Sequence, residues 1–185
     1  MRRTRDALRD ALLALMTERG WDAVDVQALC ERADVGRSTF YQHFPNKETL
    51  LTESLAGLGQ GLISMAPTDA EQVFAFLPGL LAHVDENREL VAALVGRRSA
   101  LFVHERFRDM LVSLFERSAC TPNSAPSNTP SNTPNSTARD WRAAARARAQ
   151  AAALFELIAW WLGDNRPHTA ADVEAVFRAL WTRPA

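Results

Sequence analysis

The sequence has little cysteine, almost no net charge and no long hydrophobic run. Its two cysteines, Cys30 and Cys120, have neither metal-ligand spacing nor the number that a disulfide framework needs, so we expect a reducing compartment. The formal net charge is −1, which excludes a protein-wide cationic field for binding nucleic acid. Any contact with DNA must therefore come from a local patch.

The sequence also lacks a segment with the length and apolarity of a membrane span. Its first ten residues, MRRTRDALRD, place charges throughout the stretch that would form the apolar core of a secretion signal. We therefore expect a soluble, cytoplasmic protein without a membrane partner. With 185 residues and 47% hydrophobic content, the chain is long enough to bury a real core.

Motifs that carry catalysis or bind cofactors are missing as well. The sequence has no motif of a Ser-His-Asp catalytic triad, no HExxH zinc-binding motif and no phosphate-binding loop. Residues 57–62, GLGQGL, place the third glycine one residue too early for a dinucleotide fingerprint. His83, His104 and His168 are scattered without second ligands, which favours ordinary helical histidines over metal ligands. We expect no catalytic residue, no metal and no cofactor, so the protein should not be an enzyme.

Helical periodicity dominates the chain, and no alternating strand pattern occurs. An all-α fold is therefore predicted. Asp25 stands at the N-cap position of a short second helix, residues 34–36 form a turn, and Asn46 caps a longer fourth helix. The first three helices are predicted over residues 4–19, 26–32 and 37–43.

The rest of the chain is also predicted to be helical, with caps at Thr68, Asn87 and Thr169 and a kink or break at Pro78. One segment differs. Residues 118–138 are rich in proline, serine, threonine and asparagine and contain no large apolar side chain. Because such a segment cannot bury enough surface to offset its ordering entropy, it is predicted to be a disordered loop.

Residues 20–50 carry the most specific pattern, which combines a glycine and aromatic pair, packed apolar positions and a polar block. In this segment the chain resembles the TetR family of bacterial transcriptional regulators. The resemblance implies a three-helix helix-turn-helix DNA-binding domain over residues 1–48 and a helical ligand-binding and dimerisation domain over residues 49–185. The matching residues are Gly20, Trp21, Val26, Leu29, Ala33, Val35, Thr39, Phe40, Tyr41, Phe44, Lys47 and Leu50.

The third helix is expected to enter the major groove of DNA, with its N-terminal side chains toward the base edges. Arg37 at that end can make a bidentate contact to guanine. Phe40 and Phe44 lie four residues apart and are expected in the core, as is Cys30. The expected DNA-binding residues are Arg37, Ser38, Thr39, Tyr41, Gln42, His43, Lys47 and Gln27.

Two further basic features lie near this helix. Lys47 begins the fourth helix, so its ammonium and the free backbone amides around it are expected to hold a DNA phosphate. Arg2, Arg3 and Arg5 have two interpretations, a basic arm that follows the DNA or a solvated terminus.

The resemblance also implies a homodimer that binds operator DNA and a small-molecule effector. The final two long helices would pair across a two-fold axis, with alanines 143, 144, 147 and 151 allowing close approach. The expected function is a repressor that a small apolar molecule releases from a palindromic operator. The alternative is a helical small-molecule-binding or interaction protein that does not bind DNA. Residues that suggest an apolar pocket, but that also suit an ordinary core, are Phe74, Phe76, Leu80, Phe102, Phe107, Met110 and Phe155.

Three glycines, Gly57, Gly59 and Gly61, occur within the predicted fourth helix. Each costs about 0.5–1 kcal/mol relative to alanine in a helix interior. Two interpretations remain open, a soft hinge that links effector and DNA, or close packing or an early helix end.

Overall fold

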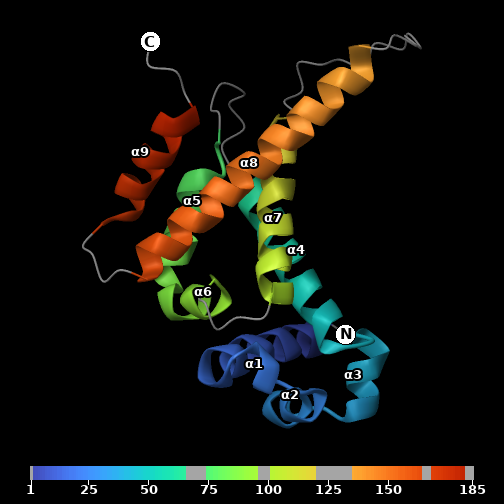
Figure 1. The fold of residues 1–185 in the computed structure, drawn as a ribbon. Coiled ribbons are helices and arrows are strands. Elements are labelled where there is room, and N and C mark those ends of the chain that lie inside the picture. Colours follow the sequence, from blue (N-terminus) through green and yellow to red (C-terminus); the bar gives the residue numbers. More distant parts are fainter. Residues whose placement is uncertain (1, 66–73, 96–100, 120–134, 164–167, 182–185) are drawn as a thin grey trace.

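The computed structural model describes residues 2–65, 74–95, 101–119, 135–163 and 168–181, and within these ranges every regular element is helical (Figure 1). The predicted all-α fold is therefore confirmed. No helix in the described ranges is long and apolar enough to cross a bilayer. The elements are α1 (Arg2–Arg19), the 3-10 turn η1 (Trp21–Ala23), α2 (Val26–Ala33), α3 (Arg37–His43), α4 (Lys47–Met65), α5 (Leu77–Glu86), α6 (Arg88–Val95), α7 (Leu101–Ala119), α8 (Asn135–Gly163) and α9 (Ala170–Trp181).

Local sequence accounts for the boundaries of α2 and α3. The carboxylate of Asp25 accepts a hydrogen bond from the amide of Ala28 at 2.7 Å, which is the predicted N-cap of α2. Asp34 ends the helix in the left-handed conformation, with φ 53°, where a short polar side chain is tolerated. Gly36 then caps α3 without a side chain. The predicted turn is confirmed.

Helix α4 links the N-terminal helices to the rest of the molecule. It rises from the end of α3 and lies beside α7 (Figure 1). The amide of Thr49 donates a hydrogen bond to the side-chain oxygen of Asn46 at 2.8 Å, which confirms the predicted cap. The helix crosses the predicted domain boundary at residues 48 and 49 without interruption, and the buried side chains on both sides form one hydrophobic cluster. The two-domain division remains a proposal.

Several predicted boundaries differ from the structure. The prediction of a loop over residues 118–138 is wrong at both ends, because α7 continues to Ala119 and α8 begins at Asn135. The rest of that segment, residues 120–134, lies outside the described ranges, as does Thr68. Pro78 falls in the first turn of α5, where its missing N–H costs nothing, so it begins a helix instead of kinking one. Asn87 directly precedes α6, as predicted, and its carbonyl accepts a hydrogen bond from the amide of Val91 at 3.0 Å. Its side chain donates back to the His83 carbonyl at 2.9 Å and so also caps the end of α5.

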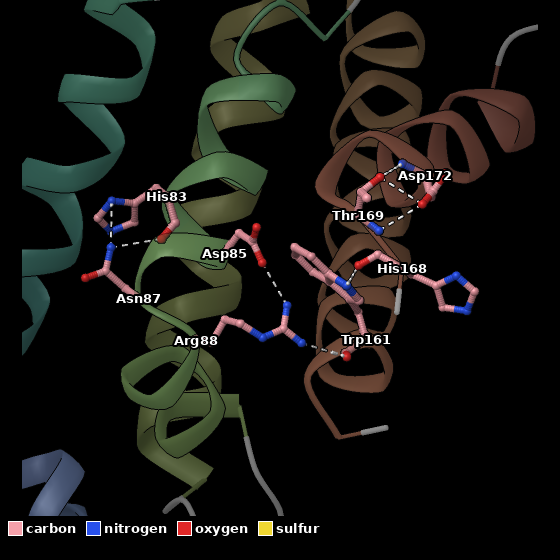
Figure 2. Close-up of polar contacts among 8 residues, drawn as sticks. All are labelled: His83, Asp85, Asn87, Arg88, Trp161, His168, Thr169 and Asp172. Atoms are coloured by element: carbon pink, nitrogen blue, oxygen red, sulfur yellow. Dashed lines mark hydrogen bonds and ion pairs between the residues drawn. The ribbon is translucent and has the colours of Figure 1, made fainter. Parts of the chain in front are cut away.

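The corner between α5 and α6 packs against the end of α8 through one arginine (Figure 2). Arg88 pairs with Asp85 at 2.9 Å, donates to the carbonyl of Trp161 at 3.5 Å and lies 4.8 Å over its ring. The indole N–H of Trp161 donates to the carbonyl of His168 at 2.8 Å. The fully buried Trp161 therefore connects α8 to His168, which lies just before α9.

Helix α9 begins with the predicted cap. The amide and hydroxyl of Thr169 both donate to a carboxylate oxygen of Asp172 at 2.8 Å, and the amide of Asp172 donates back to that hydroxyl (Figure 2). The hydrogen bonds from Thr169, the backbone amide first, hold the pKa of Asp172 below its ordinary value.

Candidate nucleic-acid interface

Helix α3 has two chemically different faces. Phe40 and Phe44 are fully buried against the core, as their spacing predicts. Arg37, Ser38, Tyr41 and Gln42 are exposed on the remaining surface, while Thr39 and His43 are half-buried. The exposed fraction of Tyr41 is 53%, which is high for an aromatic side chain. Helix α3 thus presents a polar, aromatic and cationic surface on a short element held by two buried phenylalanines.

A shallow depression of about 550 Å³ lies between α2 and α3. Its lining includes two predicted DNA contacts, Gln27 and Arg37. Gln27 is exposed, and its side-chain amide donates to a carboxylate oxygen of Glu31 at 2.9 Å. Cys30 packs beneath as a buried thiol, as predicted, and burial raises its pKa. This thiol is thus uncharged at neutral pH, and the depression has one cation and two acidic side chains, Glu31 and Asp34, on its wall.

The ammonium of Lys47 is not a free phosphate contact. It donates to the backbone carbonyls of Val24 at 2.7 Å and Trp21 at 3.1 Å, and it lies 4.4 Å over the Trp21 ring. Lys47 therefore holds η1 against the start of α4. Because an ammonium has three donors, a phosphate contact by the remaining one stays a prediction.

The N-terminal arginines Arg3 and Arg5 belong to helix α1, so neither a flexible basic arm nor a frayed terminus describes them. Arg5 forms an ion pair with Glu53 of α4, and its guanidinium lies 4.9 Å over the ring of Phe44. Sequence reasoning missed this role because the partner lies 48 residues away. Arg5 connects α1, the end of α3 and α4, and thereby positions the recognition surface.

The residues predicted to enclose an effector pocket form core in this structure. Phe74, Phe76 and Phe115 pack edge to face at the base of α5, and Phe107 packs against Phe155. Apolar side chains of this size fill the space between helices because interiors pack densely. The predicted residues that are fully or almost fully buried are Phe74, Phe76, Leu80, Phe107, Met110 and Phe155.

Two of the predicted pocket residues, Phe102 and Met110, do not simply fill the core. Phe102 of α7 is half-buried and stacks on Trp21, with ring centroids 5.7 Å apart. Met110 lines a cavity of about 160 Å³ between α4 and α7, which we call the α4–α7 cavity. Sequence reasoning missed this cavity because most of its lining is polar or small. The lining residues are Thr52, Leu55, Ala56, Gly59, Gln60, Ile63, Arg106, Asp109, Met110, Ser113, Leu114 and Arg117.

The three glycines of α4 do not interrupt the helix. A Cβ added at Gly59 would lie 3.2 Å from Cγ of Met110, whereas one added at Gly57 or Gly61 would meet nothing within 4 Å. Gly59 therefore permits the close approach of α4 and α7, which favours the packing interpretation at that position.

The N-terminal helices agree with a known family. Residues 8–53 match the family model of the bacterial regulatory proteins of the tetR family. That segment contains η1, α2 and α3 together with the first turns of α4. Residues 8–53 of this chain are therefore similar to the TetR family. The curated relatives named below are regulators, and the expectation that the chain is not an enzyme agrees with this.

Curated relatives resemble this chain in the same segment. The chain is 46% identical over 52 residues to the HTH-type transcriptional repressor KstR of Rhodococcus jostii, which is 28% of this chain and 24% of that protein. It is 39% identical over 54 residues to KstR of Mycobacterium tuberculosis, 29% of this chain and 24% of that protein. The matches thus span about a quarter of the relatives' length.

Solved structures resemble the fold over nearly the whole chain. A TetR transcriptional regulator from Streptococcus agalactiae superposes with a TM-score of 0.65 at 24% identity, covering 98% of this chain and 95% of that one. The FadR repressor of Thermus thermophilus, solved in complex with lauroyl-CoA, gives a TM-score of 0.55 at 16% identity, covering 98% and 97%. At these identities the likeness shows the fold alone.

Proposed function

We propose that this chain is a TetR-family repressor that binds a palindromic operator as a homodimer and is released by a small apolar molecule. The names of the curated relatives, HTH-type transcriptional repressors, support the DNA-binding part for residues 1–48. The ligand-binding and dimerising role of residues 49–185 rests on the geometry of this chain.

The observation that carries the proposal is the division of α3 into a buried and an exposed face. A major groove about 12 Å wide admits one helix, whose outward side chains then reach the base edges. Arg37 is exposed at the N-terminal end of α3, and Tyr41 lies one turn later on the same surface. A bidentate arginine contact to guanine contributes about 1–3 kcal/mol of discrimination between bases. Ser38, Thr39, Gln42 and His43 would supply flanking contacts.

Helices α8 and α9 offer the surface for a second copy. Trp160 is 46% exposed, Val176 51% and Leu180 66%, and exposed apolar side chains of this size often mark an interface. Ala147 and Ala151 do not belong to it, because both are buried in the core of their own chain. Two copies related by a two-fold axis would place two α3 helices on two half-sites, which requires a palindromic operator.

The test begins with selection of bound sequences from random duplex DNA, followed by titration of the best sequence. Arg37→Ala and Tyr41→Ala should each weaken binding by about tenfold or more, as expected for lost base or backbone contacts. Arg19→Ala removes an exposed cation at the far end of α1 and is the matched control, with unchanged affinity. Circular dichroism should show wild-type helicity in all three.

Unchanged affinity in both α3 variants would refute the assignment of α3 as the recognition helix. Failure to select any sequence would instead favour the alternative function, a helical small-molecule-binding or interaction protein that does not bind DNA. Sedimentation of the free protein tests the homodimer separately, and Leu180→Glu should shift it toward the monomer.

A further inference from the structure

The α4–α7 cavity combines an apolar floor with a charged rim. Leu55 and Ile63 of α4 and Leu114 of α7 line the floor together with Met110. A volume of about 160 Å³ is close to that of an engineered apolar cavity of roughly 150 Å³ that binds benzene. The space therefore suits a molecule with the bulk of one aromatic ring or a short acyl chain.

The rim carries more positive than negative charge. Arg106, Arg117 and Asp109 are its charged groups, and all three lie on α7. Arg117 donates to the side-chain oxygen of Gln60 across the cavity at 2.8 Å. Arg106 pairs with Asp109 at 3.2 Å, but the Asp109 side chain is 58% exposed, so this pair is weak. Both guanidiniums can therefore exchange these partners for a ligand anion.

We propose that the α4–α7 cavity binds a small carboxylate with an apolar body, its carboxylate held by Arg106 and Arg117. A guanidinium presents paired donors that match the two oxygens of a carboxylate, and such charge-assisted hydrogen bonds are strong. The apolar body would occupy the floor between Ile63 and Leu114. This inference rests on the proposed function, since it assigns the chemical class of the effector to this cavity.

Arg106 also connects the cavity to the N-terminal helices. Its guanidinium lies 5.4 Å over the ring of Phe102, Phe102 stacks on Trp21 at 5.7 Å, and the ammonium of Lys47 lies 4.4 Å over Trp21. A pair of stacked aromatic rings between two cations thus connects the rim of the cavity to the first residue of α4. A carboxylate that draws Arg106 away from Phe102 would weaken this stack and free Trp21 to shift.

A ligand would act on α4 directly as well. Gly59 of α4 and Met110 of α7 both line the cavity, and they pack so closely that a Cβ at Gly59 would lie 3.2 Å from Cγ of Met110. Closely packed helices shift between discrete arrangements and do not deform continuously. A molecule bound beside this contact would therefore move α4 and α7 apart as rigid helices. Since α4 carries α3 at its N-terminal end, the separation of helices would alter the placement of the recognition surface.

Direct binding to the full chain without DNA tests the site. Benzoate should bind in calorimetric titration at millimolar concentrations, while benzamide, its uncharged isostere, should bind at least about tenfold more weakly. Arg106→Gln and Arg117→Gln should each weaken benzoate binding by about tenfold. Arg108→Gln removes an exposed cation from the same helix outside the cavity lining and should leave binding unchanged.

Equal binding of benzoate and benzamide would overturn the proposal, as would wild-type benzoate affinity in both cavity variants. Absence of binding by both benzoate and hexanoate would overturn it too. Melting temperatures of the three arginine variants should stay near that of the wild type, and Arg106→Lys, which keeps the charge, should restore part of the lost affinity.

The coupling is tested on the DNA sequence selected above. Benzoate should weaken operator binding, and Phe102→Leu should retain benzoate affinity while abolishing this effect. Benzoate binding without any change in operator affinity would refute the coupling but leave the site. Failure of the chain to bind any DNA would refute the proposed function, while the calorimetric result still decides the carboxylate site.

Discussion

Replacing Lys47 distinguishes two roles of this residue, an anchor that stabilises the fold and a contact with a DNA phosphate. The contacts of its ammonium give the free energy expected for the first role. Its ammonium makes two hydrogen bonds to the carbonyls of Trp21 and Val24 and a cation–π contact with the Trp21 ring. Hydrogen bonds to a charged group contribute about 1.5–3 kcal/mol each, and a cation–π contact at a partly exposed site about 0.5–1 kcal/mol. Because the side chain is only half-buried, solvent screening and the non-additivity of such contacts reduce their combined effect below the simple sum, to about 2–3 kcal/mol.

Lys47→Met is the sharper variant, because methionine keeps an apolar stem beside Trp21 and removes the ammonium with its charge and its hydrogen-bond donors. It should lower the melting temperature by about 4–12 °C, since each kcal/mol corresponds to about 2–4 °C in a chain of this size. Urea unfolding at fixed protein concentration measures the loss of free energy of unfolding directly. Arg19→Met is the matched control, because it removes an exposed cation, and it should change stability by less than about 0.5 kcal/mol.

The salt dependence of DNA binding measures the second role. If the remaining donor of Lys47 contacts a phosphate, Lys47→Met should weaken binding to all sequences equally and reduce the salt slope by about one. A wild-type urea midpoint in Lys47→Met would refute the carbonyl anchor and leave Lys47 as a DNA contact alone. A stability loss with an unchanged salt slope would establish the anchor and exclude the phosphate contact.

Four other substitutions test local features of the fold. Gly57→Ala and Gly61→Ala should each raise the free energy of unfolding by about 0.5–1 kcal/mol, because alanine is the better helix former and has space at both positions. Gly59→Ala should not show this gain in urea unfolding, because its Cβ would crowd Met110, and an equal gain at all three positions would contradict the packing interpretation. Asp172 has a lowered pKa, so its capping stabilises the fold above the ordinary carboxyl pKa and is lost as the pH falls through the lowered value. The urea midpoint of Asp172→Asn should therefore fall less steeply with acid than that of the wild type, and parallel profiles would contradict the assigned cause.

Features that depend on neighbours three or four residues apart were predictable from the sequence. The caps at Asp25, Asn46 and Thr169 and the inward positions of Phe40 and Phe44 are local consequences of helix geometry. The outward residues of α3 follow from the same geometry, because a helix that buries one face must expose the other. The helical character of the chain and the position of the candidate recognition surface therefore did not require tertiary information.

Tertiary structure alone decided which residues meet across helices. Lys47 suits a phosphate contact by sequence, and only the folded chain brings the carbonyls of Trp21 and Val24, 26 and 23 residues away, to two donors of its ammonium. Phe74 and Phe107 suit a pocket and a core equally by composition, and only the packing of neighbouring helices put them in the core. The α4–α7 cavity lies between two helices that are distant in the chain, beside the close contact of Gly59 with Met110. Such spaces depend on the relative placement of rigid helices, which periodicity within one helix does not encode.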